Sequence, residues 1–350
     1  MRPNLPETAL AIIRVGIVRK FGLVLLRAGL LIALAVAAAW AFLAIGYRLE
    51  VADPLRMGLQ GIVILAALGA VPRLMGRGWT AGFFSFVAVL AVVLVWWNTL
   101  IAPADRQWAP EVSRQVTGVI DGDQLRLSNL RDFVWTTPEE YTENWIDTEY
   151  DLSQLQTTDV FLSYWGPQYM AHLIVSFGFA NGDQLAWSVE VRRAQGGGFS
   201  PIADMFKANT LSILAASERD VVGLRSNARG EDVHLYRLKV TPEAARNILE
   251  QYVQDATDLA KTPRWYNSLF TNCTTVVFQI MSAVGSGQPI DWRVIANGYL
   301  PEYAYEHGAV NTDVPLEQLR ELGRIAPRAL AHGLVPGFSA AIRQGVPSPN

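Results

Sequence analysis

The sequence predicts an α+β protein in which three transmembrane helices precede a larger outer domain. Two observations lead to this class. Three long apolar runs lie within the first 101 residues, and beyond them short strand patterns are followed by separate helical patterns. The chain has 350 residues, of which 51% are hydrophobic. Its net charge of -3 shows no basic signature, so nucleic acid is not expected as a partner.

The three apolar runs cover residues 23–46, 57–71 and 82–101. A span needs roughly 20 apolar residues, so the first and third runs suffice, whereas the second also needs Leu74 and Met75. The first run is too long for the apolar core of a cleavable signal peptide, and no small-residue cleavage site follows it cleanly. Buried core helices are the alternative, but three such runs are hard to hide in a soluble domain. We therefore expect three transmembrane helices within residues 23–101.

The distribution of Lys and Arg predicts the orientation, because basic residues are retained on the cytoplasmic side. The basic residues gather in two segments: Arg14, Arg19, Lys20 and Arg27 before or at the start of the first run, and Arg73 and Arg77 between the second and third. Residues 1–22 should therefore be a cytoplasmic N-terminus in a bacterial inner membrane. Everything after Ile101 should lie in the periplasm.

The outer part is expected to have three regions. Residues 102–158 should form a linker and N-terminal subdomain, with short strands such as 124–130, and residues 159–310 should form the main domain. Residues 311–350 should form a C-terminal tail. Its arginines recur every four residues, which indicates an amphipathic helix that either packs on the domain, the favoured interpretation, or lies on the membrane surface. Strands are predicted at 160–164, 171–179, 185–192, 211–216 and 233–240, a helix at 242–262 capped by Thr241, and another from about Cys273.

The hairpin around Asn181-Gly182 places two polar residues on one face of the sheet. Four large apolar residues on each strand have odd numbers: Leu173, Val175, Phe177 and Phe179 on the first strand, and Leu185, Trp187, Val189 and Val191 on the second. They share a face only if the loop has an odd number of residues. A three-residue loop centred on Asn181 pairs His172 directly with Glu190, and one centred on Gly182 makes them diagonal neighbours. A two-residue turn, the alternative, would put them on opposite faces.

Cys273 is the single cysteine of the chain. On the oxidising side of a membrane it cannot form an intramolecular disulfide, so it is either inert or chemically used. At a helix start, its thiolate would be stabilised by the helix dipole, and first-turn N–H groups could hold an oxyanion. Among the four histidines His172 is the best general base, with Glu190 to orient it. The alternative is a structural cysteine and a structural histidine.

Other chemistries find no support in the sequence. There is no Gly-x-Ser-x-Gly elbow, no His-Glu-x-x-His motif and no P-loop. A single cysteine excludes Cys-x-x-Cys metal or redox sites. We therefore expect neither a metal nor a cofactor.

Seven stretches in order resemble the Lnb N-terminal periplasmic domain family, whose namesake is a bacterial lipoprotein N-acyltransferase. They begin at Asp159, Ala171, Ser188, Glu218, Gly230, Tyr266 and Gly298, and they read DVFLSYWGP, AHLIVSFGF, SVEVRR, ERDVVGLRSN, GEDVHLYRL, YNSLFTNCTT and GYLPEY. The resemblance covers roughly residues 120–310. It implies that His172 and Cys273 match the family's proposed catalytic pair. The role of Glu190 as a third member is inferred only from the hairpin parity that it shares with His172.

The resemblance also implies a fold. A histidine on a strand followed by a cysteine at a helix start is similar to circularly permuted papain-like (NlpC/P60-type) enzymes, which include hydrolases and acyltransferases. Five further residues in these motifs are expected to bind substrate or support the site: Trp165, Arg192, Tyr266, Asn267 and Asn272. In the namesake the membrane spans follow the periplasmic domain, whereas here three precede it, so the lipoprotein substrate does not transfer with the family.

Three functions remain open on the sequence. The favoured one is thiol-dependent acyl transfer from a membrane lipid to an amine acceptor on a lipoprotein or peptide, because anchoring keeps the site near lipid. The first alternative is a cysteine hydrolase, a peptidase or amidase, of the cell envelope. The second is a non-enzymatic membrane scaffold with a structural cysteine.

Overall fold

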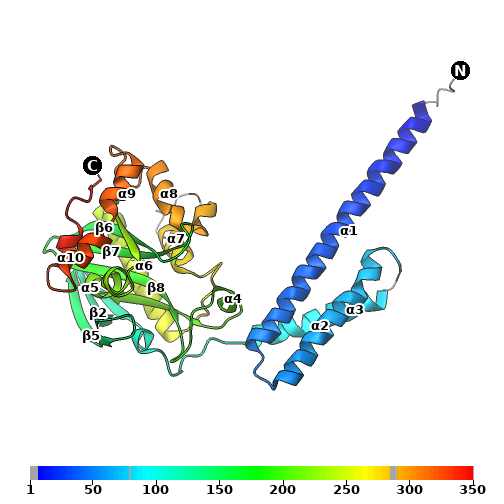
Figure 1. Cartoon of the computed structure of the whole chain (residues 1–350), viewed down its shortest axis with the longest axis horizontal. Coiled ribbons are helices and arrows are strands. Elements are labelled where there is room, and N and C mark those ends of the chain that lie inside the picture. Colours follow the sequence, from blue (N-terminus) through cyan, green and yellow to red (C-terminus); the bar gives the residue numbers. More distant parts are fainter. Residues whose placement is uncertain (1–6, 79, 284–288, 290, 350) are drawn as a thin grey trace. The chain divides into compact units, whose positions relative to one another are not determined.

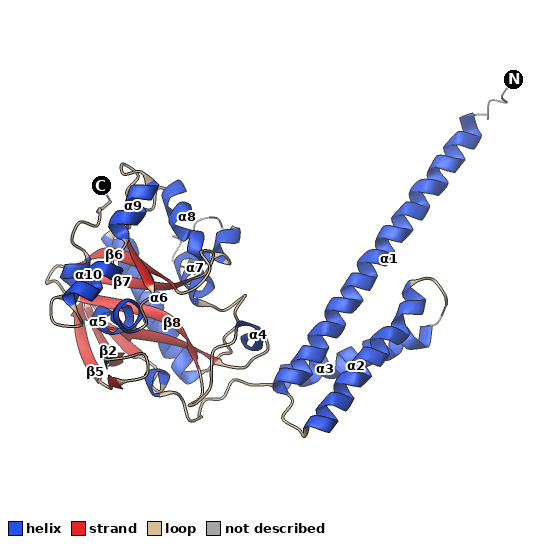
Figure 2. Cartoon of the chain, in the orientation of Figure 1, coloured by secondary structure: helices blue, strands red, loops and turns tan. Residues whose placement is uncertain are grey.

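The computed structural model describes residues 7–78, 80–283, 289 and 291–349. The chain divides into two compact units, Met1–Ile101 and Ala102–Asn350 (Figure 1). The first unit is helical, and the second combines a large sheet with helices (Figure 2). The predicted class, α+β with three apolar helices at the N-terminus, is therefore confirmed.

The first unit consists of α1 (Glu7–Arg48), α2 (Asp53–Leu74) and α3 (Thr80–Thr99). Each is long and apolar enough to cross a membrane, with the α1 span running over Val18–Arg48. Helix α2 extends to Leu74, as the short second apolar run required. A Cβ atom on Gly82 of α3 would clash with the carbonyl oxygen of Gly69 in α2. Glycines at this crossing therefore let the two helices approach backbone to backbone.

The second unit is organised around an eight-stranded sheet in the order β1-β2-β9-β8-β7-β6-β10, with β5 paired to β2. All neighbours are antiparallel except β2 and β9, which pair in parallel. The strands are β1 (Thr117–Asp121), β2 (Gln124–Arg131), β5 (Trp145–Asp151), β6 (Leu155–Tyr164), β7 (Ala171–Phe179), β8 (Gln184–Arg192), β9 (Thr210–Ala216) and β10 (Asp232–Leu238). A separate small sheet pairs β3 (Val134–Trp135) with β4 (Tyr141–Thr142).

Helices cover both faces of the large sheet, because both faces carry apolar side chains. The odd-numbered apolar residues of β7 and β8 share a core with α6 (Pro242–Lys261) and α7 (Cys273–Ala283). Even-numbered residues such as Ile174 and Ala186 form a second core with α5, α10 and α11. The remaining helices are α4 (Pro201–Asp204), α5 (Glu218–Gly223), the π-helical turn η3 (Leu224–Ala228), the 3-10 turns η1 (Pro110–Val112), η2 (Leu152–Gln154), η4 (Trp292–Val294) and η5 (Asn297–Tyr299), α8 (Leu300–Glu306), α9 (Leu316–Gly323), α10 (Ala326–His332) and α11 (Phe338–Ile342).

The hairpin β7–β8 has the register of a three-residue loop centred on Asn181. Its ladder pairs Ile174 with Ser188 and Gly178 with Gln184. Extended by one step of two residues, this register places His172 opposite Glu190. The two-residue turn, which would have put these side chains on opposite faces, is therefore not the one the chain adopts.

The structure differs from the expected division of the outer part in one respect. The sequence indicates a linker and separate subdomain over residues 102–158, yet β1, β2 and β5 all belong to the large sheet. The reason is burial: Leu125 and Leu127 of β2 are fully buried in the main core, and the Gly118 N–H of β1 donates to the Thr257 hydroxyl of α6, 3.1 Å away. The short strands at 117–121 and 145–151 carry too few apolar residues to stand out in the sequence.

The C-terminal tail packs on the domain through its apolar side. Ile325, Ala329 and Ile342 are fully buried in the second core, and the arginines find partners within the domain. Arg320 pairs with Glu302, and Arg324 lies 2.7 Å from Asp232. The regular arginine spacing suggests one continuous helix, but the helix ends at Gly323 and a second one begins at Ala326.

Candidate active site

Cys273 is the first residue of α7, and Asn272 caps that helix. The Asn272 Oδ1 accepts hydrogen bonds from the N–H groups of Thr274 and Thr275, both at 2.9 Å. The Thr275 hydroxyl in turn accepts from the Asn272 N–H at 2.9 Å, so the cap is reciprocal. The thiol therefore lies at the positive end of the helix dipole, which favours a thiolate.

The same cap changes the expectation for an oxyanion site. First-turn N–H groups seemed available for a substrate oxygen, but those of Thr274 and Thr275 already donate to Asn272. The N–H of Cys273 itself is the first-turn donor that this cap does not use. An oxyanion formed at the sulfur would therefore rely on that single group from the helix start.

The thiol lies where two strands of the sheet separate. Strand β7 pairs with β6 as far as Ala171, but its ladder with β8 begins only at Ile174. The backbone N–H of Leu173 lies in this gap and is one of the groups that lower the pKa of the Cys273 thiol. Strand separation thus supplies a backbone donor to a side chain that is only 8% exposed.

His172 connects the thiol to Glu190. The imidazole Nε2 lies 2.8 Å from the Ser188 hydroxyl and 3.1 Å from the Glu190 carboxylate. The imidazole and the Cys273 thiol also interact, because the imidazole lowers the pKa of the thiol and the thiol raises the pKa of the imidazole. Since Nε2 is already engaged, Nδ1 is the ring nitrogen left to face the sulfur. The order thiol, imidazole and carboxylate is that of a nucleophile, a general base and an orienting group.

The carboxylate of Glu190 belongs to a longer buried chain of charges. Its Oε1 accepts from the Ser188 hydroxyl at 2.7 Å and from Arg225 Nη2 at 3.0 Å. Arg225 is 6% exposed and also pairs with Glu231 at 3.4 Å, and Glu231 accepts a short hydrogen bond from Ser163. Arg225 therefore bridges the two carboxylates in a largely buried region, and Arg229 also pairs with Glu231 at 3.7 Å.

These contacts shift the pKa values of Cys273, His172 and Glu190 in the directions that favour a thiolate–imidazolium ion pair. Burial raises the pKa of the Cys273 thiol, but the hydrogen bond and positive charge of His172, with the Leu173 N–H, lower it below its usual value overall. Burial and Arg225 lower the pKa of His172, yet Glu190 and the thiol hydrogen bond raise it more. Burial raises the pKa of Glu190, but His172 and Arg225 bring it well below its usual range. Thiolate and imidazolium are therefore stabilised together.

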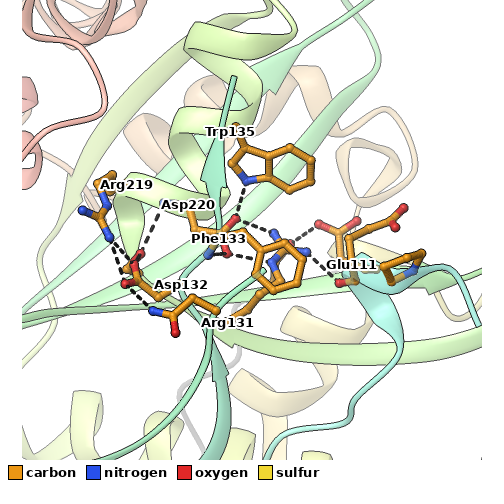
Figure 3. A network of polar contacts seen from close by, with 12 residues as sticks. Glu111, Arg131, Asp132, Phe133, Trp135, Arg219 and Asp220 are labelled. Atoms are coloured by element: carbon orange, nitrogen blue, oxygen red, sulfur yellow. Dashed lines mark hydrogen bonds and ion pairs between the residues drawn. The ribbon is translucent and has the colours of Figure 1, made fainter. Parts of the chain in front are cut away.

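Arg225 is positioned by the helix that begins at Glu218, and a second buried charge holds that helix. Asp220, fully buried in α5, accepts from Arg131 Nε at 2.8 Å and Nη2 at 3.0 Å. It also accepts from the Phe133 N–H at 2.9 Å and from Trp135 Nε1 at 2.7 Å (Figure 3). The helix then widens into the π-helical turn that carries Arg225, a distortion often found at functional sites.

Asn297 fixes the helix start to the strand. Its Nδ2 donates to the Ala171 carbonyl at 2.6 Å and to the Thr274 hydroxyl at 2.8 Å, and it lies 3.8 Å from the Cys273 sulfur. Its Oδ1 accepts from the Ala171 N–H at 2.7 Å. One buried amide therefore sets the distance between the strand of His172 and the helix of Cys273.

The other predicted residues have different positions. Tyr266 is buried, and the negative charges of Cys273 and Glu190, after burial itself, raise its pKa, which places it near the site. Asn267 shapes the preceding loop, since its Oδ1 accepts from two backbone N–H groups at 3.0 and 3.1 Å. Trp165 is 47% exposed and packs edge-on against Phe199.

Arg192 contacts the chain segment that precedes β1. Its guanidinium donates to the Val112 and Ser113 carbonyls at 2.9 and 2.7 Å, and it stacks on Trp108 with 4.4 Å to the ring centroid. These contacts hold the segment through which the chain enters the sheet. The sequence motif that suggested a site role for Arg192 therefore reflects a structural contact.

Three site residues were missed from the sequence: Ser188, Arg225 and Asn297. Ser188 shares the even parity of His172 and Glu190, so the hairpin pattern could have indicated it. Arg225 lies within one of the quoted motifs and Asn297 directly precedes another, but no periodicity relates either residue to the thiol. Within the described part of the chain, no group of three or more His, Cys, Asp or Glu side chains is arranged to hold a metal ion.

Fold and site together define a membrane protein whose outer α+β domain carries a paired cysteine and histidine. Residues 141–298 match the family model of the Lnb N-terminal periplasmic domain, so this part of the chain belongs to that family and the resemblance read from the motifs is confirmed. The chain is thus a membrane protein with a periplasmic domain. Searches of curated proteins and of solved structures found no match to it.

Proposed function

We propose that this protein is a cysteine-dependent acyltransferase of the bacterial inner membrane, with a cytoplasmic N-terminus and a permuted papain-like periplasmic domain. The observation that carries the proposal is the pairing of His172 with Glu190, 3.1 Å apart on neighbouring strands, and the interaction of His172 with Cys273 at the start of α7, which lowers the pKa of the thiol. The order of a histidine on a strand followed by a cysteine at a helix start supports the papain-like fold. Three apolar helices in the same chain supply the membrane anchor.

The chemistry divides into two balanced steps. The Cys273 thiolate attacks the carbonyl carbon of a phospholipid ester, and the tetrahedral intermediate expels the glycerol oxygen, which takes a proton from the His172 imidazolium. The acyl chain is then a thioester on Cys273, and the lysophospholipid leaves. An amine of a lipoprotein or peptide attacks this thioester, His172 takes the amine proton, and the thiolate leaves. Glu190 holds the imidazole through both steps.

The test is the intact mass of the full-length protein in detergent with phospholipid and no amine. We expect a mass increase of one acyl chain that hydroxylamine removes. Cys273→Ser should lose the thioester signal, and His172→Ala should acylate slowly. Cys273-dependent cleavage of peptide or amide bonds without a lipid adduct would instead identify the protein as a hydrolase. Full complementation of a deletion strain by Cys273→Ala would identify a structural cysteine.

A further inference from the structure

Seven large apolar side chains are exposed on segments around the helix start that carries Cys273. We call this set the apolar rim, and each member is between 47% and 72% exposed: Trp165, Tyr169, Phe199, Ile202, Phe270, Trp292 and Ile295. Single exposed apolar residues are ordinary on protein surfaces, whereas a set that includes several aromatic residues on connected loops marks an interaction surface.

The segments of the apolar rim are joined to one another by direct contacts. The rings of Trp165 and Phe199 pack edge-on with centroids 6.4 Å apart, and the Gly298 N–H donates to the Tyr169 carbonyl at 3.2 Å. The loop before α7 contacts the segment after α4 through Asn267 Nδ2 and the Met205 carbonyl, 3.4 Å apart. The rim is therefore one connected structure, and α4 and α7 lie at the same end of the domain in Figure 1.

The same structure is bonded to the reactive residues. Asn297, in the segment of Trp292 and Ile295, holds the first turn of α7 to β7. Phe270 lies three residues before Cys273 in the loop that Asn267 shapes. A surface that binds the apolar rim would therefore be next to the thiol.

The composition of these segments favours lipid over protein as the occupant. Three of the four segments, residues 165–170, 194–203 and 265–272, contain no Asp, Glu, Lys or Arg, and in the fourth Arg293 is paired with Asp291 at 2.6 Å. Trp and Tyr are enriched where proteins meet the interface of a bilayer, because an apolar ring with a polar edge suits that depth. A protein interface of this extent would be expected to carry polar and charged residues at its rim.

A short covalent linker joins the outer domain to the last membrane helix. Helix α3 ends at Thr99, and the chain joins the outer domain where the Gln195 N–H donates to the Gln107 carbonyl at 2.8 Å. The eight residue-to-residue steps from Thr99 to Gln107 span at most about 28 Å when fully extended. Gln195 begins the same uncharged segment that carries Phe199 and Ile202. The rim segment that carries Phe199 and Ile202 is therefore connected to the last membrane helix by a short linker.

We propose that the apolar rim docks on the phospholipid bilayer and places the mouth of the Cys273 site at the headgroup–acyl boundary. The donor lipid would then reach the thiol without crossing water. This inference deepens the proposed function and relies on it only for the fate of the lipid.

The test uses Cys273→Ser, which makes the full chain free of cysteine. Single cysteines at Phe270, Ile202 or Ile295 are labelled with an environment-sensitive fluorophore in phospholipid nanodiscs. Matched controls place the label at Val119, Leu330 or Val335, which are 50–65% exposed on other elements. Rim labels should shift to the blue, be quenched by lipids spin-labelled on the acyl chain and resist aqueous iodide. Control labels should show the reverse.

Two results would overturn the proposal. Rim labels that match the controls would show a surface facing water. Rim labels that resist iodide but ignore the spin-labelled lipid would show a surface covered by protein. Because the thiol is absent from every variant, docking is measured without acyl transfer. Loss of the thioester in the wild-type protein would therefore refute the proposed chemistry while leaving this readout unchanged.

Discussion

Glu190→Gln removes the negative charge of the third site residue but keeps the size and shape of its side chain. The glutamine keeps an oxygen near His172 Nε2, but the attraction for the imidazolium is lost. Without the Glu190 carboxylate, the Arg225 guanidinium repels the imidazolium of His172. Both changes lower the pKa of His172, and a less cationic His172 lowers the thiol pKa less. The Cys273 thiolate should therefore appear at higher pH in the variant than in the wild type.

The size of the effect follows from the geometry. Two unit charges 3.1 Å apart interact by about 5 kcal/mol at an effective dielectric constant of about 20, which is an upper limit. The side chains of His172 and Glu190 are 12% and 21% exposed, and the glutamine oxygen remains a hydrogen-bond acceptor, so part of this energy is retained. We expect a net loss of about 1.4–2.8 kcal/mol, which is about 10- to 100-fold in rate at neutral pH.

The assay is the rate of alkylation by iodoacetamide as a function of pH, read by intact mass. Since Cys273 is the single cysteine, the whole mass increase reports one thiol. Only the thiolate reacts, so a lowered thiol pKa moves the rate curve to lower pH, and Glu190→Gln should move it back to higher pH. Glu231→Gln is the matched control, because it removes the other carboxylate of Arg225 without touching His172. Superimposable curves for wild type and Glu190→Gln would refute the reasoning.

Three further predictions concern the pair, the topology and the scaffold. Cys273→Ala and His172→Ala should each abolish activity in a complementation assay while the protein still folds and inserts, as checked by membrane fractionation. Reporter fusions after Ile101 should be active only outside the cytoplasm, and those within residues 72–81 only inside; a cytoplasmic signal after Ile101 would overturn the orientation. Asp220→Ala removes the acceptor of four hydrogen bonds, so it should lower the free energy of unfolding by about 3–5 kcal/mol in denaturant titrations.

The hairpin shows how much of the site the sequence could predict. Strand parity is a strict rule, because a shift of one residue moves every side chain to the other face. The odd-numbered apolar residues of β7 and β8 therefore limited the register to odd-residue loops and placed His172 and Glu190 on one face. The helix cap at Thr241 is predictable for a similar reason, since its side chain accepts from the Ala244 N–H only three positions along the chain.

The remaining contacts depend on residues far apart in the chain. Arg225 reaches Glu190 because a buried Asp220 clamps the helix that carries it, and nothing in the local sequence specifies that clamp. Asn297 reaches Ala171 across 126 positions. The separation of β7 from β8 before Ile174, beside which the Leu173 N–H lowers the pKa of the thiol, is a tertiary feature as well. Patterns of period two and 3.6 carry no information about such pairs.

Burial of the thiol limits the access of oxidants and water to Cys273. A thiolate on the oxidising side of a membrane is open to oxidation when water and oxidants reach it. Cys273 is only 8% exposed, so the fold that lowers the pKa of its thiol also limits the access of water. Restricted water slows hydrolysis of a thioester and leaves time for an amine to arrive. If the proposed thioester forms, we therefore expect the access of water to Cys273, more than the identity of the base, to decide between transfer and hydrolysis.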